Sequence, residues 1–503
     1  MSYIVSKKTY SRGNTTRGLY LGVPEAEGEN NPGQGLKEFY EDYLDINDAF
    51  LSGKFIITGR KGVGKSAYVK HLCDNSSLDN EMLCSLVKYN TKTLVKIIQG
   101  IPDEISDKYC VVHEWIILSE MVKLLLKNTN ASYSDGYSAI KRFFEINSGI
   151  LDITKWMTVS QEQTTSFEVN YYPLWKWSPG KFGKSFKSSQ SRAPFYSLIP
   201  SLRNIISEIL AYDSCKGINF IVIFDDLDIG LDLNNDQHKN ELMDLIRIAR
   251  DYNTLYFPNQ DSRVLLMLRD DIARRLDGIA PDKNKIFSSY EYNLNWYDSD
   301  KDLSEKKSHI RSFINRRISI GLKTLGIDYN NSDPWSSLVD ERYSADSSKS
   351  EFKFVLDCTF YRPRDFVALF KDIGKCNYPI PISHENMKNL IVKYTHSNAE
   401  EIKDELTNLF SRNEIESVFR LLRSIADSRD GFSYNDIISE IKRLHLRDDT
   451  LEILLDYCLV VPKDKREFQY YSYREKIRLE HEQDYRYRVS RPLYIHFKPN
   501  TLN

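Results

Sequence analysis

The sequence predicts an α/β fold with a parallel sheet that helices cover on both faces. The apolar runs that fit strands of such a sheet lie at 55–57, 84–89, 220–224, 264–268 and 290–294. These runs are too short for helices, and helical patterns at 113–126 and 198–210 lie between them. Because parallel strands need crossover connections, this order favours a sheet built from βαβ units.

The most specific motif follows the first apolar run. Residues 59–66 read G-R-K-G-V-G-K-S, which matches the phosphate-binding pattern G-x-x-x-x-G-K-[ST]. Its glycines let backbone N–H groups turn toward a phosphate, Lys65 supplies a positive charge, and Ser66 offers a hydroxyl to Mg²⁺. The predicted nucleotide-binding residues are Gly59, Arg60, Lys61, Gly62, Val63, Gly64, Lys65, Ser66 and Ala67. A Gly-rich turn with a chance lysine is the alternative interpretation.

Carboxylates follow the run at 220–224. Asp225, Asp226 and Asp228 come where this strand would leave the sheet, at the carboxyl edge where α/β folds bind ligands. Neighbouring carboxylates in a desolvated place repel each other unless a cation neutralises them. We expect Asp225 to hold Mg²⁺ through water, Asp226 to polarise an attacking water, and Asp228 to cap the next helix. An acidic surface turn is the alternative.

Arginines offer further candidates for contact with a phosphate. Arg269 ends another strand run and is expected to reach a γ-phosphate, unless it forms a surface ion pair with Asp270 or Asp271. Arg316 and Arg317 would suit an arginine finger for a neighbouring subunit, but a solvated helix face is the expectation there.

The sequence Y-R-P-R-D at 361–365 is a third arginine motif. Pro363 is expected at a helix start with Asp365 in the first turn. Arg364 would then point back toward the nucleotide as a catalytic residue. A structural Arg–Asp pair is the other interpretation.

These motifs, in this order, resemble the additional-strand P-loop ATPases near the AAA, STAND and origin-recognition groups. They are most similar to a bacterial family that pairs D-D-L-D with an R-P-R-D lid motif. The resemblance is carried by 59–66, Asp225, Asp226, Arg269 and 362–365, and by Leu21-Gly22 with Glu25-Ala26-Glu27, which is similar to a G-x-x-x-A-E lead-in. It implies a P-loop NTPase fold, ATP with Mg²⁺, ATPase activity, and a switch that couples ATP binding to self-association. By analogy with related bacterial ATPases, it also implies a role in anti-phage defence.

The predicted organisation has four parts. Residues 1–50 form a helical lead-in that packs against the nucleotide domain, and 51–297 form the ATPase core with an arm inserted at about 146–194. A helical lid at 298–397 precedes a winged-helix-like domain at 398–503. The last domain is expected to place helices near 414–427, 434–443 and 450–457 before β-rich pieces from 468 to 497.

Two basic, aromatic stretches are candidates for partners. The stretch 171–192 interleaves lysines with tryptophans and tyrosines, and suits a nucleic acid, a protein partner or a local core equally well. In the C-terminal wing, at 470–498, acidic residues dilute the arginines, so packing on the domain's own helices is favoured there. A nucleotide switch, an ATP-licensed DNA-binding protein and a nucleotide-bound scaffold for a separate effector all stay open.

Composition narrows the class of protein. At roughly 150 residues per domain, the 503 residues suffice for two or three domains, and a formal net charge of −2 does not indicate a nucleic-acid binder. The seven cysteines are scattered without a C-x-x-C pair, and no apolar run approaches the ~18 residues of a membrane span. With no leader pattern near Met1, we expect reduced thiols, no membrane partner and a cytoplasmic location.

Overall fold

The computed structural model of the chain describes residues 14–76, 81–88, 98, 101, 107–147, 198–228, 232, 234–257, 262–341, 350–463 and 485–502. Contacts between Cα atoms divide the chain into two compact units. The first comprises residues 45–61 and 65–294, and the second comprises 1–44, 62–64 and 295–503. Most of the predicted arm, including the basic stretch 171–192, lies outside the described residues.

The first unit is built on a five-stranded sheet in the order β2-β3-β4-β1-β5. Its strands are β1 (Ile56–Gly59), β2 (Met82–Lys88), β3 (Asn219–Asp225), β4 (Arg263–Arg269) and β5 (Glu291–Asn293). Every pairing in it is parallel, as the sequence predicts. Strand β4 lies between β1 and β3, so one additional strand separates the strand of the phosphate motif from the acidic strand.

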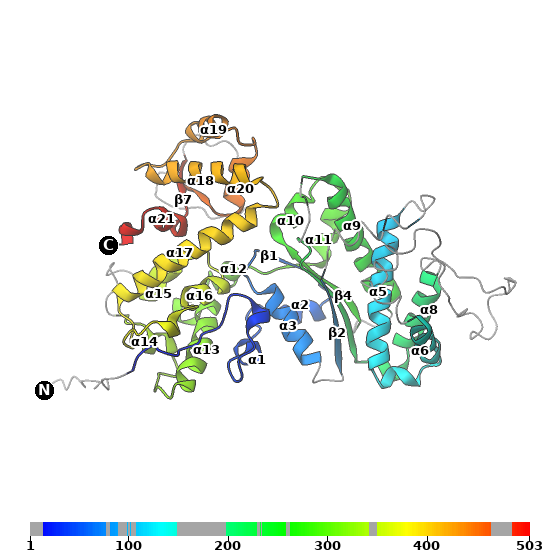
Figure 1. Ribbon diagram of the computed structural model, residues 1–503. Helices are drawn as coiled ribbons and strands as arrows, with labels where there is room; N and C mark the ends of the chain where they lie inside the picture. The colour runs from blue at the N-terminus through cyan, green and yellow to red at the C-terminus, as the bar shows by residue number, and fades with distance from the viewer. Residues whose placement is uncertain are drawn as a thin grey trace. The chain divides into compact units, whose positions relative to one another are not determined.

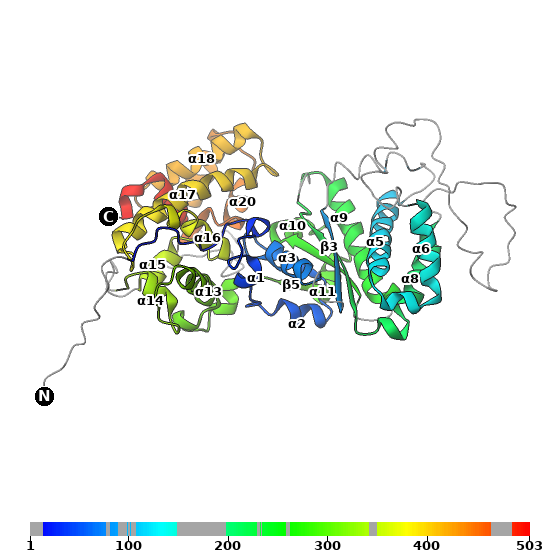
Figure 2. The ribbon, with the colours of Figure 1, turned by 60° about the horizontal axis from the view of Figure 1, so that its bottom comes forward.

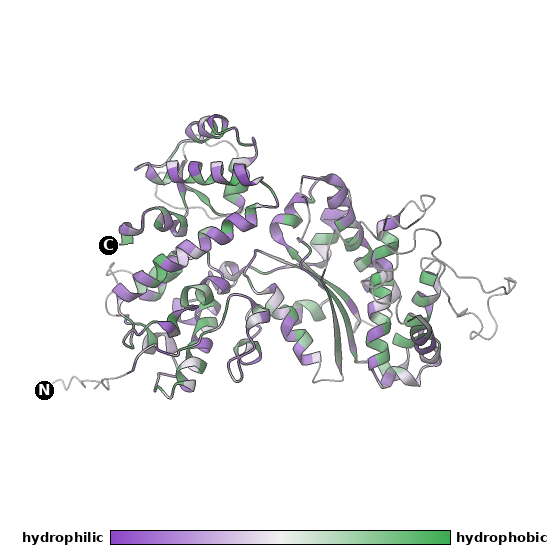
Figure 3. Ribbon diagram, in the orientation of Figure 1, coloured by the Kyte–Doolittle hydropathy of each residue, from purple (hydrophilic) through white to green (hydrophobic). Residues whose placement is uncertain are grey.

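The apolar runs become strands because both faces of the sheet are covered. Residues of β1 and β4 are buried throughout, and Figure 3 shows the strands coloured as hydrophobic. Figures 1 and 2 show α3 (Lys65–Ser76) on one face, with α5 (Lys108–Lys127) and α9 (Asp236–Asp251) on the other. Outside α5 lie α6 (Asp135–Asn147) and α8 (Ile199–Leu210), so α5 is apolar on most of its surface. The unit also contains α2 (Ile46–Leu51), α10 (Asp270–Arg275) and α11 (Lys283–Tyr290).

The second unit is mostly helical. Its first part consists of α1 (Leu36–Phe39), α12 (Trp296–Asp300), α13 (His309–Thr324), α14 (Pro334–Leu338), α15 (Glu351–Asp357), α16 (Pro363–Phe370) and α17 (His384–Leu406). Several helices begin where a serine hydroxyl accepts a backbone N–H, as at Ser308 before α13 and Ser383 before α17. No helix among the described residues is long and apolar enough to cross a membrane.

The C-terminal part follows the order of a winged helix. Helices α18 (Arg412–Asp427), α19 (Tyr434–Arg443) and α20 (Thr450–Asp456) precede β6 (Val460–Lys463) and β7 (Arg486–Val489), which pair antiparallel. The expectation of β structure up to residue 497 is wrong, because residues after Ser490 form helix α21 (Arg491–Phe497). Pro492 suits the first turn of a helix, where its missing N–H costs nothing.

The described residues of the lead-in up to Leu44 belong to the second unit. Arg317 on α13 forms an ion pair with Glu29, and both side chains are buried. The guanidinium of Arg317 also lies 4.5 Å from the ring centroid of Phe39. The expected solvated face is therefore wrong for Arg317.

Arg316, the neighbouring arginine, stays half-exposed. Its Nε donates to the carbonyl oxygen of Glu38 at 2.8 Å, and its Nη1 lies 3.2 Å from a carboxylate oxygen of Glu41. Both contacts tie α13 to the lead-in.

Gly22 explains part of the lead-in motif. Its φ of +110° lies in the region that favours glycine, and a Cβ there would collide with the Arg317 guanidinium and the Glu29 carboxylate. The Leu21-Gly22 turn therefore lets the backbone approach this buried ion pair, with the carbonyl of Leu21 accepting from Arg317 at 3.0 Å.

Candidate functional site

The phosphate motif forms the turn between β1 and α3. Gly62 and Gly64 have φ angles of +86° and +110°, which residues with side chains rarely adopt. A Cβ on Gly64 would have nothing within 4 Å, so the backbone is open to a ligand there. Because α3 begins at Lys65 and runs for 12 residues, its unpaired first N–H groups and its dipole favour an anion at this turn.

Ser66 and Asp225 come together at the carboxyl edge of the sheet. Burial raises the pKa of the Asp225 carboxyl group, while the nearby Ser66 hydroxyl, the backbone N–H of Asp226 and the charge of Lys65 act in the opposite direction. The sheet order explains the meeting, since β1 and β3 end at the same edge with only β4 between them.

This pair fits a magnesium ion. Mg²⁺ prefers oxygen ligands and is usually held by one or two carboxylates together with phosphate and water oxygens. No group of three or more His, Cys, Asp or Glu side chains within the described ranges could hold a metal by itself. A Mg²⁺ bound here would therefore depend on Ser66, Asp225 and the phosphates of a nucleotide.

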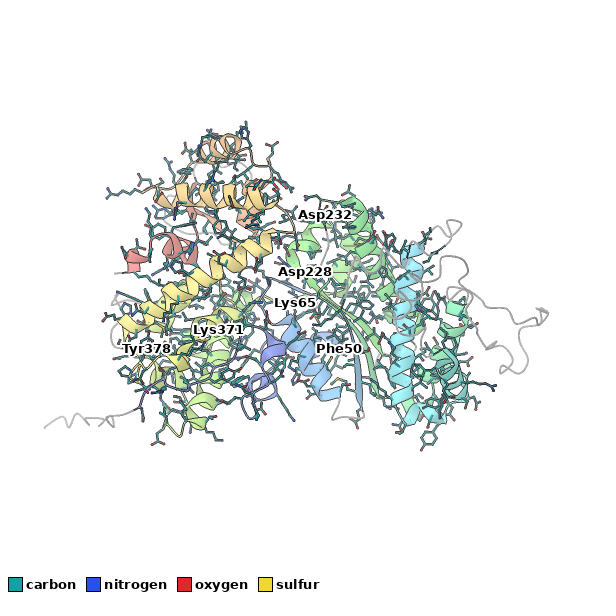
Figure 4. The ribbon with its side chains drawn as sticks, in the orientation of Figure 1. Phe50, Lys65, Asp228, Asp232, Lys371 and Tyr378 are labelled. Carbon is teal, nitrogen blue, oxygen red and sulfur yellow. The ribbon has the colours of Figure 1, made fainter. Side chains whose placement is uncertain are left out.

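Lys65 lies half-buried at the same edge. Its Nζ donates to the carbonyl oxygens of Gly59 at 2.5 Å and Arg60 at 3.1 Å. Burial lowers the pKa of Lys65, and nearby carboxylates partly offset this effect. The charged side chains that act on it are Asp270, Arg269, Asp225 and Asp228. Figure 4 shows Lys65 and Asp228 at this end of the sheet.

Asp226 stands at the turn after β3. Its φ of +57° is uncommon for a residue with a side chain and directs the chain sharply out of the sheet. Its carboxylate is about one-third exposed and lies 3.9 Å from Nζ of Lys88, at the end of β2. Sequence analysis did not identify Lys88 as a site residue. Lys88 reaches Asp225 and Asp226 through the strand register, in which Lys88 pairs with Asp225.

Arg269 is held by two carboxylates. Its Nε and Nη2 donate to the two oxygens of Asp271 at 3.0 and 2.8 Å, and its Nη1 donates to Asp228 at 3.1 Å. The alternative interpretation, an ion pair between Arg269 and Asp271, is therefore confirmed. Arg269 is only 8% exposed, so this pair is buried and does not lie at the surface as expected. The expectation that Asp228 caps the next helix is wrong, because Asn235 caps α9.

The two arginines of the R-P-R-D motif have different partners. Helix α16 begins at Pro363 with Asp365 in its first turn, as predicted. Arg362 is buried and pairs with Asp365 at 2.8 Å, which is the structural Arg–Asp pair. Arg364 instead pairs with Glu401 at 2.6 Å.

Arg364 also contacts the phosphate loop. Its backbone N–H donates to the carbonyl oxygen of Gly62 at 3.3 Å, and Gly62 belongs to the same unit as α16. A Cβ on Gly62 would lie 2.9 Å from Cβ of Arg364, which leaves no room for a side chain. In the same unit, the indole nitrogen of Trp296 donates to the carbonyl oxygen of Val63 at 2.9 Å.

A comparison with protein-family models gives no match, and a comparison with curated proteins gives none either. Among solved structures, Cdc6p from Pyrobaculum aerophilum is 10% identical with a TM-score of 0.28, over 97% of this chain and 98% of that chain. The ORC2 protein of Aeropyrum pernix, in ADPNP–ADP complexes, is also 10% identical with a TM-score of 0.28, over 95% of this chain and 94% of that chain.

The fold class rests on the chain's own geometry. The strand order, the glycine turn between β1 and α3, and the acidic end of β3 define an α/β P-loop NTPase fold with one additional strand. The second unit adds helices and a C-terminal part in winged-helix order.

Proposed function

We propose that the chain is a P-loop ATPase that binds ATP with Mg²⁺, hydrolyses it slowly and acts as a conformational switch. The observation that carries this proposal is the sheet order, in which β1, with the phosphate turn and Lys65 after it, and β3, with Asp225 at its end, lie on the two sides of β4. Lys65 and Ser66 are neighbours in the sequence and Asp225 comes from a distant stretch, and the fold brings all three to the edge of the sheet where ligands of α/β proteins bind.

Each residue of the site has a task in this proposal. Backbone N–H groups at the start of α3 and the charge of Lys65 bind phosphate oxygens. Ser66 and Asp225 would hold Mg²⁺, which supplies positive charge to the β- and γ-phosphates. Asp226 orients the attacking water, and the short reach of Asp compared with Glu is the reason to expect slow turnover. Arg269, kept in place by Asp271, contacts the γ-phosphate.

The switch is supported by the second unit. Arg364 lies against Gly62, so a nucleotide that shifts the glycine turn would act directly on the start of α16. Self-association and a role in anti-phage defence stay predictions from the resemblance. A cytoplasmic location stays a prediction from the cysteine pattern and the N-terminal sequence, and a separate protein effector stays an open hypothesis. ATP rather than GTP also rests on that resemblance.

The direct test is titration with a fluorescent ATP analogue. Lys65→Ala should lose at least about 100-fold in affinity, since a charge that binds phosphate is removed. Lys70→Ala is the matched control, because Lys70 lies on the same helix but pairs with Asp74 at 3.3 Å. Equal affinities of wild type and Lys65→Ala would contradict the proposal.

A second candidate is an ATP-licensed DNA-binding protein. The observation that favours it is the order of three helices and an antiparallel pair of strands in the C-terminal part, with Arg486 and Arg488 on β7. Gel-shift titrations of duplex and single-stranded DNA, with ATP and with ADP, would test it. A binder of the phosphate backbone must weaken steeply as salt rises. Absence of any shift at low salt would exclude this candidate.

A further inference from the structure

Arg269 is bound from two sides by carboxylates that differ in their surroundings. Asp271 takes two of its donors, Nε and Nη2, in the bidentate geometry of a strong Arg–carboxylate pair. Asp228 takes Nη1 through a single contact at 3.1 Å. The side chain of Asp271 is 9% exposed, and that of Asp228 is 26% exposed.

This difference gives the two acids different effects on Arg269. The bidentate, buried contact with Asp271 fixes the orientation of the guanidinium plane. The single, more exposed contact with Asp228 leaves that carboxylate able to turn toward solvent at small cost. Asp228 therefore occupies a donor that another anion is able to take over.

The surroundings of Asp228 indicate that the competing anion is a phosphate group. Arg269 pairs in register with Gly59, the first residue of the phosphate turn, and Asp228 contacts Arg269, so both lie at this turn. A phosphate group brought to this edge would meet the carboxylate of Asp228 beside Arg269 and would be repelled by it. A nucleoside triphosphate reaches further from the turn than a diphosphate does, so its terminal phosphate meets this carboxylate.

We infer that Asp228 is an intramolecular competitor of the γ-phosphate for Nη1 of Arg269, and thereby sets how strongly the site prefers a triphosphate over a diphosphate. The inference rests on the proposed function, because it concerns the same nucleotide site. Binding of ATP displaces Asp228 from Arg269, whereas binding of ADP leaves the Arg269–Asp228 contact in place. The contact thus lowers the affinity for ATP selectively.

The test compares the dissociation constants of a non-hydrolysable ATP analogue and of ADP in the full chain, by isothermal titration calorimetry. Asp228→Asn keeps the size of the side chain and removes its charge. It should raise the ratio of ATP-analogue affinity to ADP affinity by roughly 2- to 5-fold, the size expected for a partly exposed ion pair.

The matched control is Asp270→Asn. Asp270 also acts on Lys65, but it pairs with Arg274 at 3.1 Å instead of with Arg269. Its loss should change the affinities for both nucleotides by the same factor. In an Arg269→Gln background, Asp228→Asn should no longer alter the ratio, because the guanidinium donor for which Asp228 and the γ-phosphate compete is absent.

The results separate the inference from the proposed function. An unchanged or lowered ratio in Asp228→Asn, in a protein whose wild type binds both nucleotides, overturns the inference and leaves the proposed function standing. A lowered ratio would instead mean that Asp228 orients Arg269 toward the phosphate. Wild-type protein that binds neither nucleotide overturns both.

Discussion

Ser66 and Asp225 lie beside each other at the carboxyl edge of the sheet, although they are 159 positions apart in the chain. The contact joins the first turn of α3 to the last residue of β3 across the carboxyl edge of the sheet. Burial favours a protonated carboxyl group at Asp225, and the Ser66 hydroxyl acts against this effect.

Asp225→Asn should remove the part of ATP affinity that depends on Mg²⁺. The amide keeps the shape of the side chain, but it lacks the charge that attracts the ion. Titration of ATP with Mg²⁺ and with EDTA should give a large difference in affinity for the wild type and a much smaller one for the variant. Because burial raises the pKa of Asp225, the Mg²⁺-dependent affinity of the wild type should also weaken as the pH falls. A variant that keeps the full Mg²⁺ effect would contradict the assignment of Asp225.

Gly62→Ala should weaken nucleotide binding while the fold survives. The added methyl group would meet Cβ of Arg364 at 2.9 Å, and the φ of +86° is unfavourable for alanine by about 1 kcal/mol. Both effects distort the turn that presents N–H groups to the phosphates. Titration with a fluorescent ATP analogue should show roughly a 10-fold or greater loss.

Gly217→Ala is the matched control for this change. Its φ of +79° imposes the same backbone strain, but a Cβ there has nothing within 4 Å. It should lower the free energy of unfolding by about 1 kcal/mol through this strain and leave nucleotide affinity intact. Equal losses of affinity in both variants would mean that general destabilisation, and not the crowded turn, is responsible.

The elements that the sequence predicts correctly are those whose signals are local. The strands appear as apolar runs because the sheet is covered on both faces, and the phosphate turn appears as a fixed spacing of glycines and a lysine. The start of α16 at Pro363 follows from the missing N–H of proline. Each of these can be recognised within a few residues.

The contacts that sequence analysis misjudged connect distant segments. Glu29 and Arg317 lie 288 positions apart, and Asp228 and Arg269 lie 41 apart. An aspartate between a strand and a helix has the local pattern of a helix cap. In this chain Asn235 caps α9, and Asp228 instead accepts a hydrogen bond from Arg269. Buried arginines on a helix cannot be told from solvated ones until the partner that neutralises them is located.

His113 should make the protein less stable in mild acid. This side chain of α5 is fully buried, and burial lowers its pKa from 6.5 to about 3. The unfolded chain therefore binds a proton below pH 6.5, whereas the folded chain does so only near pH 3. The stability of the neutral, buried form is present in full above pH 6.5 and is lost as the pH falls toward 3. At about pH 5, the loss from this one group amounts to about 2 kcal/mol.

The measurement is urea unfolding at about pH 7.5 and pH 5 for the wild type and for His113→Gln, which carries no titratable group. The free energy of unfolding of the wild type should fall by about 2 kcal/mol more than that of the variant over this range. His445→Asn is the control, because His445 is exposed and its φ of +52° suits asparagine. It should show the same acid sensitivity as the wild type. Identical pH dependence in wild type and His113→Gln would mean that the folded protein protonates His113 as readily as the unfolded chain does.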